Sequence, residues 1–268
     1  MSVPSGKAEP RLTNDELIDS EVPAAVVCAH CGDADCPGCL EEQTRSGVVA
    51  VVAWERPGTG AMTRLWATAR ATTLDAERFF ESLPDGPMAP ALRFAVVSEV
   101  LASGAMAVAA LVPIALIAPG WLGQLLLHET IAVVRPAVVG VPGLAALLVA
   151  AHVAHGWALD LGARRSGARG ATSRAVRFGL YSAGWDLVIG PLGVVIVGLK
   201  EGFRAALSVA SVGLGLPGRS ARAFLRGCYR LEGLSAASAL RASYVAAAVS
   251  TTIGALAVIA GILLAIFQ

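Results

Sequence analysis

The sequence predicts an all-α fold: a polytopic membrane helical bundle of about five transmembrane helices, with a small N-terminal zinc knuckle. Only 15% of the 268 residues are charged, whereas soluble domains carry about a quarter. Hydrophobic residues make up 55% but aromatic residues only 6%, so Ala, Val, Leu and Gly supply the excess, as in helices that pack closely in lipid. The formal net charge of +1 argues against a nucleic-acid partner.

The segment before the first apolar run divides into three parts. Residues 1–24 are polar and contain proline, so we expect a disordered tail without a cleaved secretory signal. A cysteine-rich module follows at 25–45, and an amphipathic juxtamembrane segment at 55–93. The membrane domain then occupies 94–268.

Four of the five cysteines share one 12-residue window, and we assign them as ligands of a structural zinc ion: Cys28, Cys31, Cys36 and Cys39. Each Cys-x2-Cys pair can turn two thiolates onto one ion, and tetrahedral thiolate sites favour zinc. His30 is an alternative ligand, and an iron–sulfur cluster or no metal at all are the alternatives to zinc. A closed four-thiolate site stabilises a fold without catalysing, which indicates a docking element.

Apolar residues recur at helical spacing through 61–83, beginning with Met62, Leu65 and Trp66. Arginines interleave with them, as in a helix that lies in the headgroup layer. The alternative is that this segment packs on neighbouring spans. The same two interpretations apply to 121–134, which is too short to cross a membrane.

Three apolar stretches are long enough to be spans, namely 94–118, 137–159 and 242–267. The stretch from Thr172 to Pro217 is either two spans, 174–191 and 193–217, or one span that ends near Leu199 with a short interfacial helix after it. Basic residues collect before the first span, in the 160–177 loop and in 218–241. Five spans with a cytoplasmic N-terminus place all three basic groups in the cytoplasm, whereas four spans would leave the last group outside. The fourth span is the least regular, because it contains Lys200 and Arg204.

Ionisable residues within the spans predict an intramembrane polar network of His152, His155, Asp186, Lys200 and Arg204. Such residues usually face the bundle interior, where the two histidines would relay protons or bind a metal. The alternative is structural: neutral histidines that bond backbone carbonyls, and an ion pair between Asp186 and a cation of the next span. The chain contains no phosphate-binding loop or catalytic motif, so we expect no enzyme.

Small residues repeat every four positions along the last span, at Ala246, Ser250 and Gly254 and then at Ala257, Gly261 and Ala265. They predict a close helix contact, either within the chain or in a homo-oligomer.

Several segments resemble the YIP family, which are multispan membrane proteins that interact with Rab GTPases. The segment 171–183 is similar to the start of that family's third span, and Pro191-Leu192-Gly193 to its proline–glycine turn. Residues 227–235 resemble the segment before its last span, and 66–83 its first amphipathic helix. The resemblance covers 55–268 and implies five spans, a cytoplasmic N-terminus and a role in membrane organisation.

Together these features predict a non-enzymatic scaffold or trafficking-type adaptor of a bacterial inner membrane. Its zinc module and basic surface would recruit a cytoplasmic protein, such as a small GTPase, and the basic loops would favour anionic membrane lipid. The alternative function is a small transporter or channel with a polar path through the bundle.

Overall fold

The computed structural model describes residues 52–56, 60–128, 134, 136–213 and 215–267. The chain divides into two units, Met1–Ala50 and Val51–Gln268, and every described residue belongs to the second. The predicted tail and the cysteine module at 25–45 therefore lie outside the described residues. Within those residues the secondary structure is helical without any strand, which confirms the all-α class for this part of the chain.

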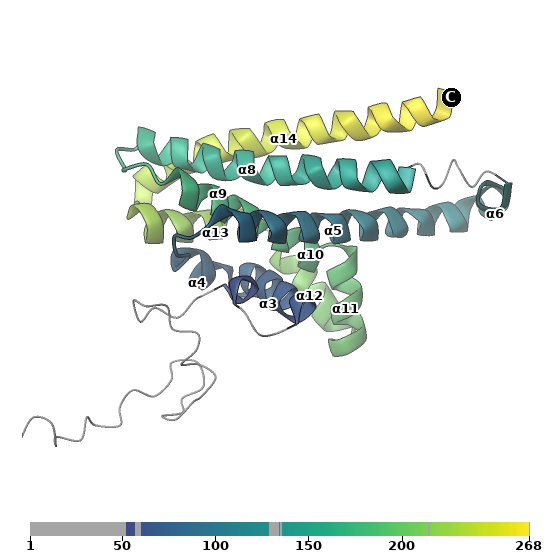
Figure 1. Cartoon of the computed structure of the whole chain (residues 1–268), viewed down its shortest axis with the longest axis horizontal. Coiled ribbons are helices and arrows are strands. Elements are labelled where there is room, and N and C mark those ends of the chain that lie inside the picture. The colour runs from purple at the N-terminus through teal and green to yellow at the C-terminus, as the bar shows by residue number, and fades with distance from the viewer. Residues whose placement is uncertain (1–51, 57–59, 129–133, 135, 214, 268) are drawn as a thin grey trace, which may run out of the picture. The chain divides into compact units, whose positions relative to one another are not determined.

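Three long helices run side by side: α5 (Met88–Ile117), α8 (Val141–Arg165) and α14 (Gly233–Phe267) (Figure 1). A π-helical turn, Pro136–Gly140, comes directly before α8. The α8 helix packs against both α5 and α14. The predicted span 242–267 falls within α14, and α5 contains the predicted span 94–118 up to Ile117.

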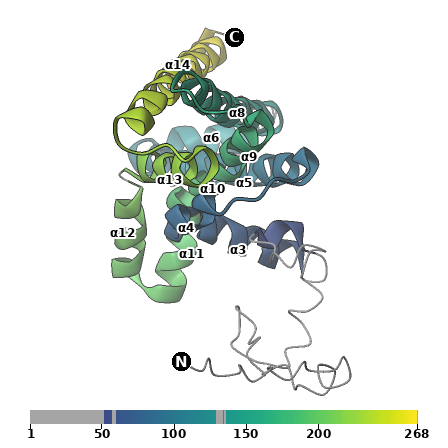
Figure 2. The same cartoon turned by 90° about the vertical axis from the view of Figure 1, so that its left-hand side faces the viewer.

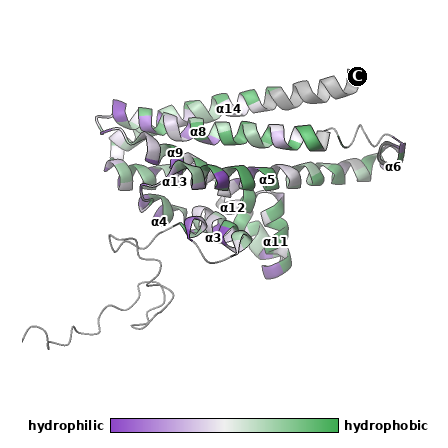
Figure 3. Ribbon diagram, in the orientation of Figure 1, coloured by the Kyte–Doolittle hydropathy of each residue, from purple (hydrophilic) through white to green (hydrophobic). Residues whose placement is uncertain are grey.

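Two of the described helices, Met88–Ile117 and Val138–Arg165, are long and apolar enough to cross a membrane. In the most apolar 18-residue stretch of each helix, only 12% of the first and 17% of the second is buried inside the protein. Most of this apolar surface therefore faces outward. In Figure 3 the ribbon of α5 and α8 is coloured hydrophobic over long stretches and hydrophilic at the end of α8. Such large exposed apolar faces are stable in lipid rather than in water.

The third apolar stretch is broken into short helices. α9 (Thr172–Ser182) and α10 (Gly184–Ile189) form one arm, and α11 (Pro191–Glu201) continues from them at a bend of 54°. Pro191 lacks a backbone N–H and begins α11, which explains why the helix changes direction there. This bent pair is either a third, broken span or a re-entrant segment, so the described residues hold two or three candidate spans.

The predicted fourth span, 193–217, is wrong as a single helix. α11 ends at Glu201, and α12 (Phe203–Val212) returns alongside it after a turn at Gly202. Gly202 has a φ of 91°, a left-handed conformation that favours glycine. Helices of 11 and 10 residues are each about 16 Å long, which is half of a hydrocarbon core.

Shorter helices cover one end of the long ones. α3 (Ala61–Leu74) and α4 (Ala76–Glu81) come before α5, and α13 (Leu216–Phe224) with the π turn Leu225–Tyr229 comes before α14. α13 packs on α4, and Figure 2 shows the two beside each other. Beyond α5, the short helix α6 (Pro119–His128) occupies the first part of the predicted 121–134 segment.

The helices at this end share an aromatic core around Phe178. The ring of Phe178 lies 4.6 Å from Phe80 of α4 and 4.7 Å from Phe224 of α13, measured between centroids, and all three side chains are fully buried. In α3, Leu65 is buried while Met62 is 65% exposed. The 61–83 segment therefore packs on neighbouring helices, as the second interpretation of its amphipathic pattern proposed.

Glycines set the distance between α8 and α9. A Cβ at Gly156 of α8 would overlap the carbonyl oxygen of Ala175, and a Cβ at Gly179 of α9 would overlap the carbonyl oxygen of His152. The two backbones are thus in direct contact, a spacing that only glycine permits. This contact holds the His152 region of α8 against the end of α9.

Candidate cation site

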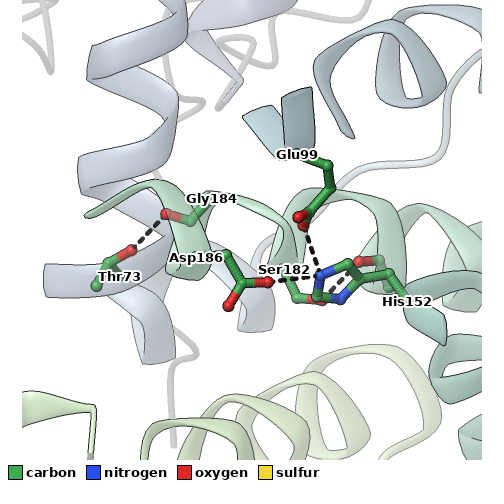
Figure 4. Close-up of polar contacts among 7 residues, drawn as sticks. Thr73, Glu99, His152, Ser182, Gly184 and Asp186 are labelled. Atoms are coloured by element: carbon green, nitrogen blue, oxygen red, sulfur yellow. Dashed lines mark hydrogen bonds and ion pairs between the residues drawn. The ribbon is translucent and has the colours of Figure 1, made fainter. Parts of the chain in front are cut away.

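Three ionisable side chains from three helices meet inside the bundle: Glu99 of α5, His152 of α8 and Asp186 of α10 (Figure 4). The Nε2 atom of His152 lies 2.9 Å from Oε1 of Glu99 and 3.0 Å from Oδ2 of Asp186. The three groups are close enough to share one metal ion. Glu99 and His152 lie within the two candidate spans, where ionisable residues are costly and usually functional.

Glu99 and His152 lie at similar depths in their helices. Glu99 is 11 residues after Met88, and His152 is 13 residues before Arg165. At 1.5 Å per residue, these positions are about 16 Å and about 20 Å from the same end of the bundle. The imidazole and the carboxylate therefore meet well inside their helices.

A serine fixes the orientation of the imidazole. The hydroxyl of Ser182 donates to the carbonyl of Gly179, and its oxygen lies 2.9 Å from Nδ1 of His152. A serine hydroxyl has one hydrogen, so its second contact is as an acceptor and Nδ1–H is the donor. In a neutral imidazole this leaves the lone pair of Nε2 facing the two carboxylates.

The charges of the cluster do not balance. Two ionised carboxylates carry two negative charges, and a fully protonated His152 supplies only one positive charge. In the salt bridges of the described residues, neither carboxylate has a lysine or arginine partner. A neutral cluster therefore needs two protons or one divalent cation.

The surroundings of the Glu99 carboxylate also show that the cluster lacks positive charge. Its side chain is fully buried, and its Oε2 atom has no hydrogen-bond partner. A buried carboxylate oxygen without a donor is costly unless a proton or a cation occupies the site. By contrast, 44% of the Asp186 side chain is exposed, so the cluster is accessible from the Asp186 side.

The α3 helix holds Asp186 in place through its backbone neighbours. The indole N–H of Trp185 donates to the carbonyl of Thr72 at 2.8 Å. The hydroxyl of Thr73, whose shorter hydrogen bond at 2.8 Å is to the carbonyl of Ala69, also contacts the carbonyl of Gly184 at 3.3 Å. The contacts of Trp185 and Gly184 tie the first turn of α10 to α3, as Figure 4 shows for Thr73 and Gly184. The amphipathic helix before the first span is thus part of the support of the site.

The structure brings two of the five predicted network residues together, His152 and Asp186. His155 points elsewhere: its ring lies 5.9 Å from that of Phe178, and its Nε2 atom is buried without a hydrogen-bond partner. The two histidines therefore do not form one relay, although they are three residues apart.

Lys200 and Arg204 lie outside the cluster, exposed on either side of the Gly202 turn. The expected ion pair between Asp186 and one of these cations is therefore wrong for the described residues, because Asp186 pairs with His152. Sequence reasoning missed Glu99 as a member of the site. Its signal was present, since it is the one charge in the apolar stretch 94–118.

A second buried carboxylate, Asp160, lies near the end of α8. Its Oδ1 accepts the backbone N–H of Ala171 at 2.8 Å and the hydroxyl of Tyr229 at 2.5 Å. Its Oδ2 accepts the hydroxyl of Thr172 at 2.8 Å and contacts the guanidinium of Arg164 at 2.9 Å. Burial and the bond to Asp160 raise the pKa of Tyr229, so its hydroxyl stays protonated as a donor.

Cys28, Cys31, Cys36 and Cys39 lie outside the described residues, so the predicted zinc site stays a prediction. The fifth cysteine, Cys228, is half-buried in the π turn before α14, and burial raises the pKa of its thiol. Comparison of the chain with protein-family models, curated proteins and solved structures gave no match.

Proposed function

We propose that the chain is a small, non-enzymatic membrane transporter or channel for cations, with Glu99, His152 and Asp186 as its binding site. The observation that carries this proposal is the pair of carboxylates around one imidazole nitrogen, of which Glu99 is fully buried with one oxygen unpartnered and Asp186 is partly exposed. Buried polar groups that serve only the fold are normally satisfied by hydrogen bonds. A cluster that needs additional positive charge is instead a binding site for protons or metal ions.

The broken helix beside the site supports transport. Asp186 lies in the short α10, one turn before the bend at Gly190 and Pro191. In many transporters, discontinuous helices carry the ion-binding groups, since irregular backbone within a membrane is tolerated where it lines a cavity. The exposed side of Asp186 provides the route by which an ion reaches the sealed Glu99.

The topology that we infer has three crossings, α5, α8 and α14, with α9–α13 starting and ending on the cytoplasmic side. Tyr229 bonds to Asp160, so the start of α14 lies beside the end of α8. The three basic groups then remain cytoplasmic, as five spans also required. Lys200 and Arg204 are exposed on either side of the Gly202 turn, and their long side chains would have to extend to the headgroup layer. Three crossings per chain are few for a transporter, so we expect an oligomer.

Proton flux in liposomes tests the proposal. The full chain is reconstituted, a potassium diffusion potential is imposed with valinomycin, and internal pH is followed with a trapped dye. We expect flux above that of empty liposomes, and a return to the empty-liposome rate in Glu99→Gln and in Asp186→Asn.

The matched control is Glu201→Gln, which removes an exposed carboxylate at the end of α11 and should conduct like the unaltered chain. Size-exclusion profiles and melting temperatures show whether each variant is folded. Equal flux in the unaltered chain, Glu99→Gln and empty liposomes would exclude transport of protons through this site.

A second function, recruitment of a cytoplasmic partner, is supported by the four cysteines and by the YIP resemblance. A zinc knuckle at 25–45 on the cytoplasmic face of a bacterial inner membrane would present a small docking surface. Capture from native membranes, with Ser at positions 28, 31, 36 and 39 as the comparison, tests this role. A protein retained by the unaltered chain and lost by the variant would support it, and equal retention would exclude it.

A further inference from the structure

We infer that the Glu99–His152–Asp186 cluster is a site for a divalent transition-metal ion, which it binds in exchange for protons. This inference rests on the proposed function and names its substrate class. A carboxylate cluster alone would not establish a metal site. The independent observation is the fully buried Oε2 atom of Glu99, which has no partner although the rest of the cluster converges on the same carboxylate.

The donor atoms select the class of ion. One imidazole nitrogen and two carboxylate oxygens form a mixed set that suits Mn²⁺, Fe²⁺, Co²⁺ and Zn²⁺. Mg²⁺ and Ca²⁺ prefer oxygen ligands alone, so the imidazole discriminates against them. Cu⁺ prefers the sulfur ligands that this site lacks.

The spacing of the donors is that of ligands on one ion. With metal–ligand bonds of about 2.1 Å, two ligands at a right angle are about 3.0 Å apart, and at a tetrahedral angle about 3.4 Å. The two distances from His152 Nε2 to the carboxylate oxygens are 2.9 and 3.0 Å. These two distances match ligands at near-right angles on one ion, and all three ligand atoms lie within 4.8 Å of one another.

The residues around the imidazole match those of known metal-binding histidines. A ligating histidine usually donates its other ring N–H to a neighbouring oxygen, which orients the ring and increases its basicity. Ser182 accepts that bond from Nδ1 of His152 and is itself fixed by the carbonyl of Gly179. The arrangement presents Nε2 to the ion without rearrangement.

Charge balance couples the metal to protons. The neutral cluster holds two protons when no metal is bound, and a divalent ion replaces both because its ligands must be deprotonated. Among the described residues, His155 is a further buried titratable group one turn along α8 from His152. Metal affinity should therefore rise with pH.

Zinc binding to the full chain in detergent tests the inference, with Ser replacing the cysteines at 28, 31, 36 and 39 so that they do not contribute. Competition with a chelating dye gives affinity and stoichiometry, and proton release is read in weakly buffered solution. We expect one zinc ion per chain and about two protons released per ion. Glu99→Gln should weaken binding at least about 100-fold, with Glu201→Gln unchanged as the matched control.

Ser182→Ala provides a second variant that keeps all three ligands. Losing the partner of Nδ1 should weaken zinc binding about 10-fold at the same stoichiometry. If the chain without the four N-terminal cysteines binds no zinc, or binds Mg²⁺ equally well, the inference is wrong whether or not Glu99→Gln folds. Absence of metal binding together with Glu99-dependent proton flux would overturn the metal site alone. Metal binding without any flux of protons or zinc would overturn transport instead.

Discussion

Asp160 and Glu99 are two buried carboxylates of the same bundle, and their surroundings differ. Four donors surround Asp160, including a backbone N–H and an arginine, and both of its oxygens are used. Glu99 is buried more completely, yet one oxygen contacts His152 and the other contacts no donor. Burial alone therefore does not distinguish a structural carboxylate from a functional one. The two are distinguished by the number of hydrogen-bond donors that the protein supplies to each.

The difference has an energetic meaning. Asp160 is stabilised in its charged form by permanent partners, so it joins α8, α9 and the π turn as a fixed connection. Glu99 lacks such partners and is stabilised only when a proton or a cation arrives. The first carboxylate should matter for folding and the second for binding, and substitutions can separate the two.

The largest effect on stability is expected for Asp160→Ala. This change leaves the hydroxyl of Tyr229 and the N–H of Ala171 without an acceptor at the junction of three elements. Removing one partner of a buried charge network typically costs about 3 kcal/mol. Thermal unfolding in detergent measures it, with Asp85→Ala as the control, because Asp85 is an exposed aspartate. Equal melting temperatures for the two variants would show that the Asp160 connection is not structural.

Gly156→Ala should have the next largest effect. The added Cβ overlaps the carbonyl of Ala175, so α8 and α9 must separate, at a cost of about 2 kcal/mol. The separation also moves His152 away from Asp186, so zinc binding should weaken along with stability. Gly143→Ala on the same helix is the control, since a Cβ there meets no atom within 4 Å. If both glycine variants bind and unfold alike, close packing of α8 on α9 does not position the site.

Glu99→Gln should change stability by less than about 1 kcal/mol, or increase it, although it weakens zinc binding at least about 100-fold. Glutamine keeps the volume of the side chain and removes the cost of burying a charged oxygen that has no hydrogen-bond donor. The melting temperature of this variant, measured without metal, is compared with that of Asp160→Ala. A loss of stability as large as that of Asp160→Ala would show that Glu99 is a structural residue, and the contrast between the two carboxylates would fail.

Hydrophobic patterning predicted much of the fold and little of its irregular part. The spans at 94–118 and 137–159 are recognisable because one long apolar run becomes one helix. The 193–217 stretch looked similar by composition, but Gly202 breaks it, and hydropathy alone does not report a left-handed glycine. The amphipathic spacing around Leu65 indicated an apolar face correctly without specifying whether lipid or protein covers it.

The site was predictable as a set of residue types but not as a set of contacts. The sequence predicted His152 and Asp186 as site residues because ionisable side chains are costly in a membrane span. Which cation Asp186 would meet depended on the fold of the α11–α12 hairpin, and the hairpin carries Lys200 away from it. Glu99 is 53 residues from His152 in sequence, so only the packing of α5 on α8 reveals their contact.

The smallest effect is expected for Glu81→Gln, which tests whether an exposed ion pair adds to this end of the bundle. Both carboxylate oxygens of Glu81 contact Arg226, at 2.8 and 2.7 Å. The hydrogen bond from Arg226 lowers the pKa of Glu81, so the pair stabilises the fold above the ordinary pKa of the carboxyl and is lost as pH falls through the lowered value. Because the pair is exposed and screened by salt, we expect a barely measurable loss near neutral pH.

Melting temperatures from neutral pH down to about pH 3 measure this pair, and the difference between Glu81→Gln and the unaltered chain should shrink as the solution becomes acidic. Glu201→Gln, whose carboxylate is exposed at the end of α11, should show no such trend. High salt should remove the difference at neutral pH. A pH-independent difference that survives high salt would mean that Glu81 acts through packing against α13 rather than through its charge. The division between permanently paired and partner-deficient carboxylates would then apply only to the buried residues.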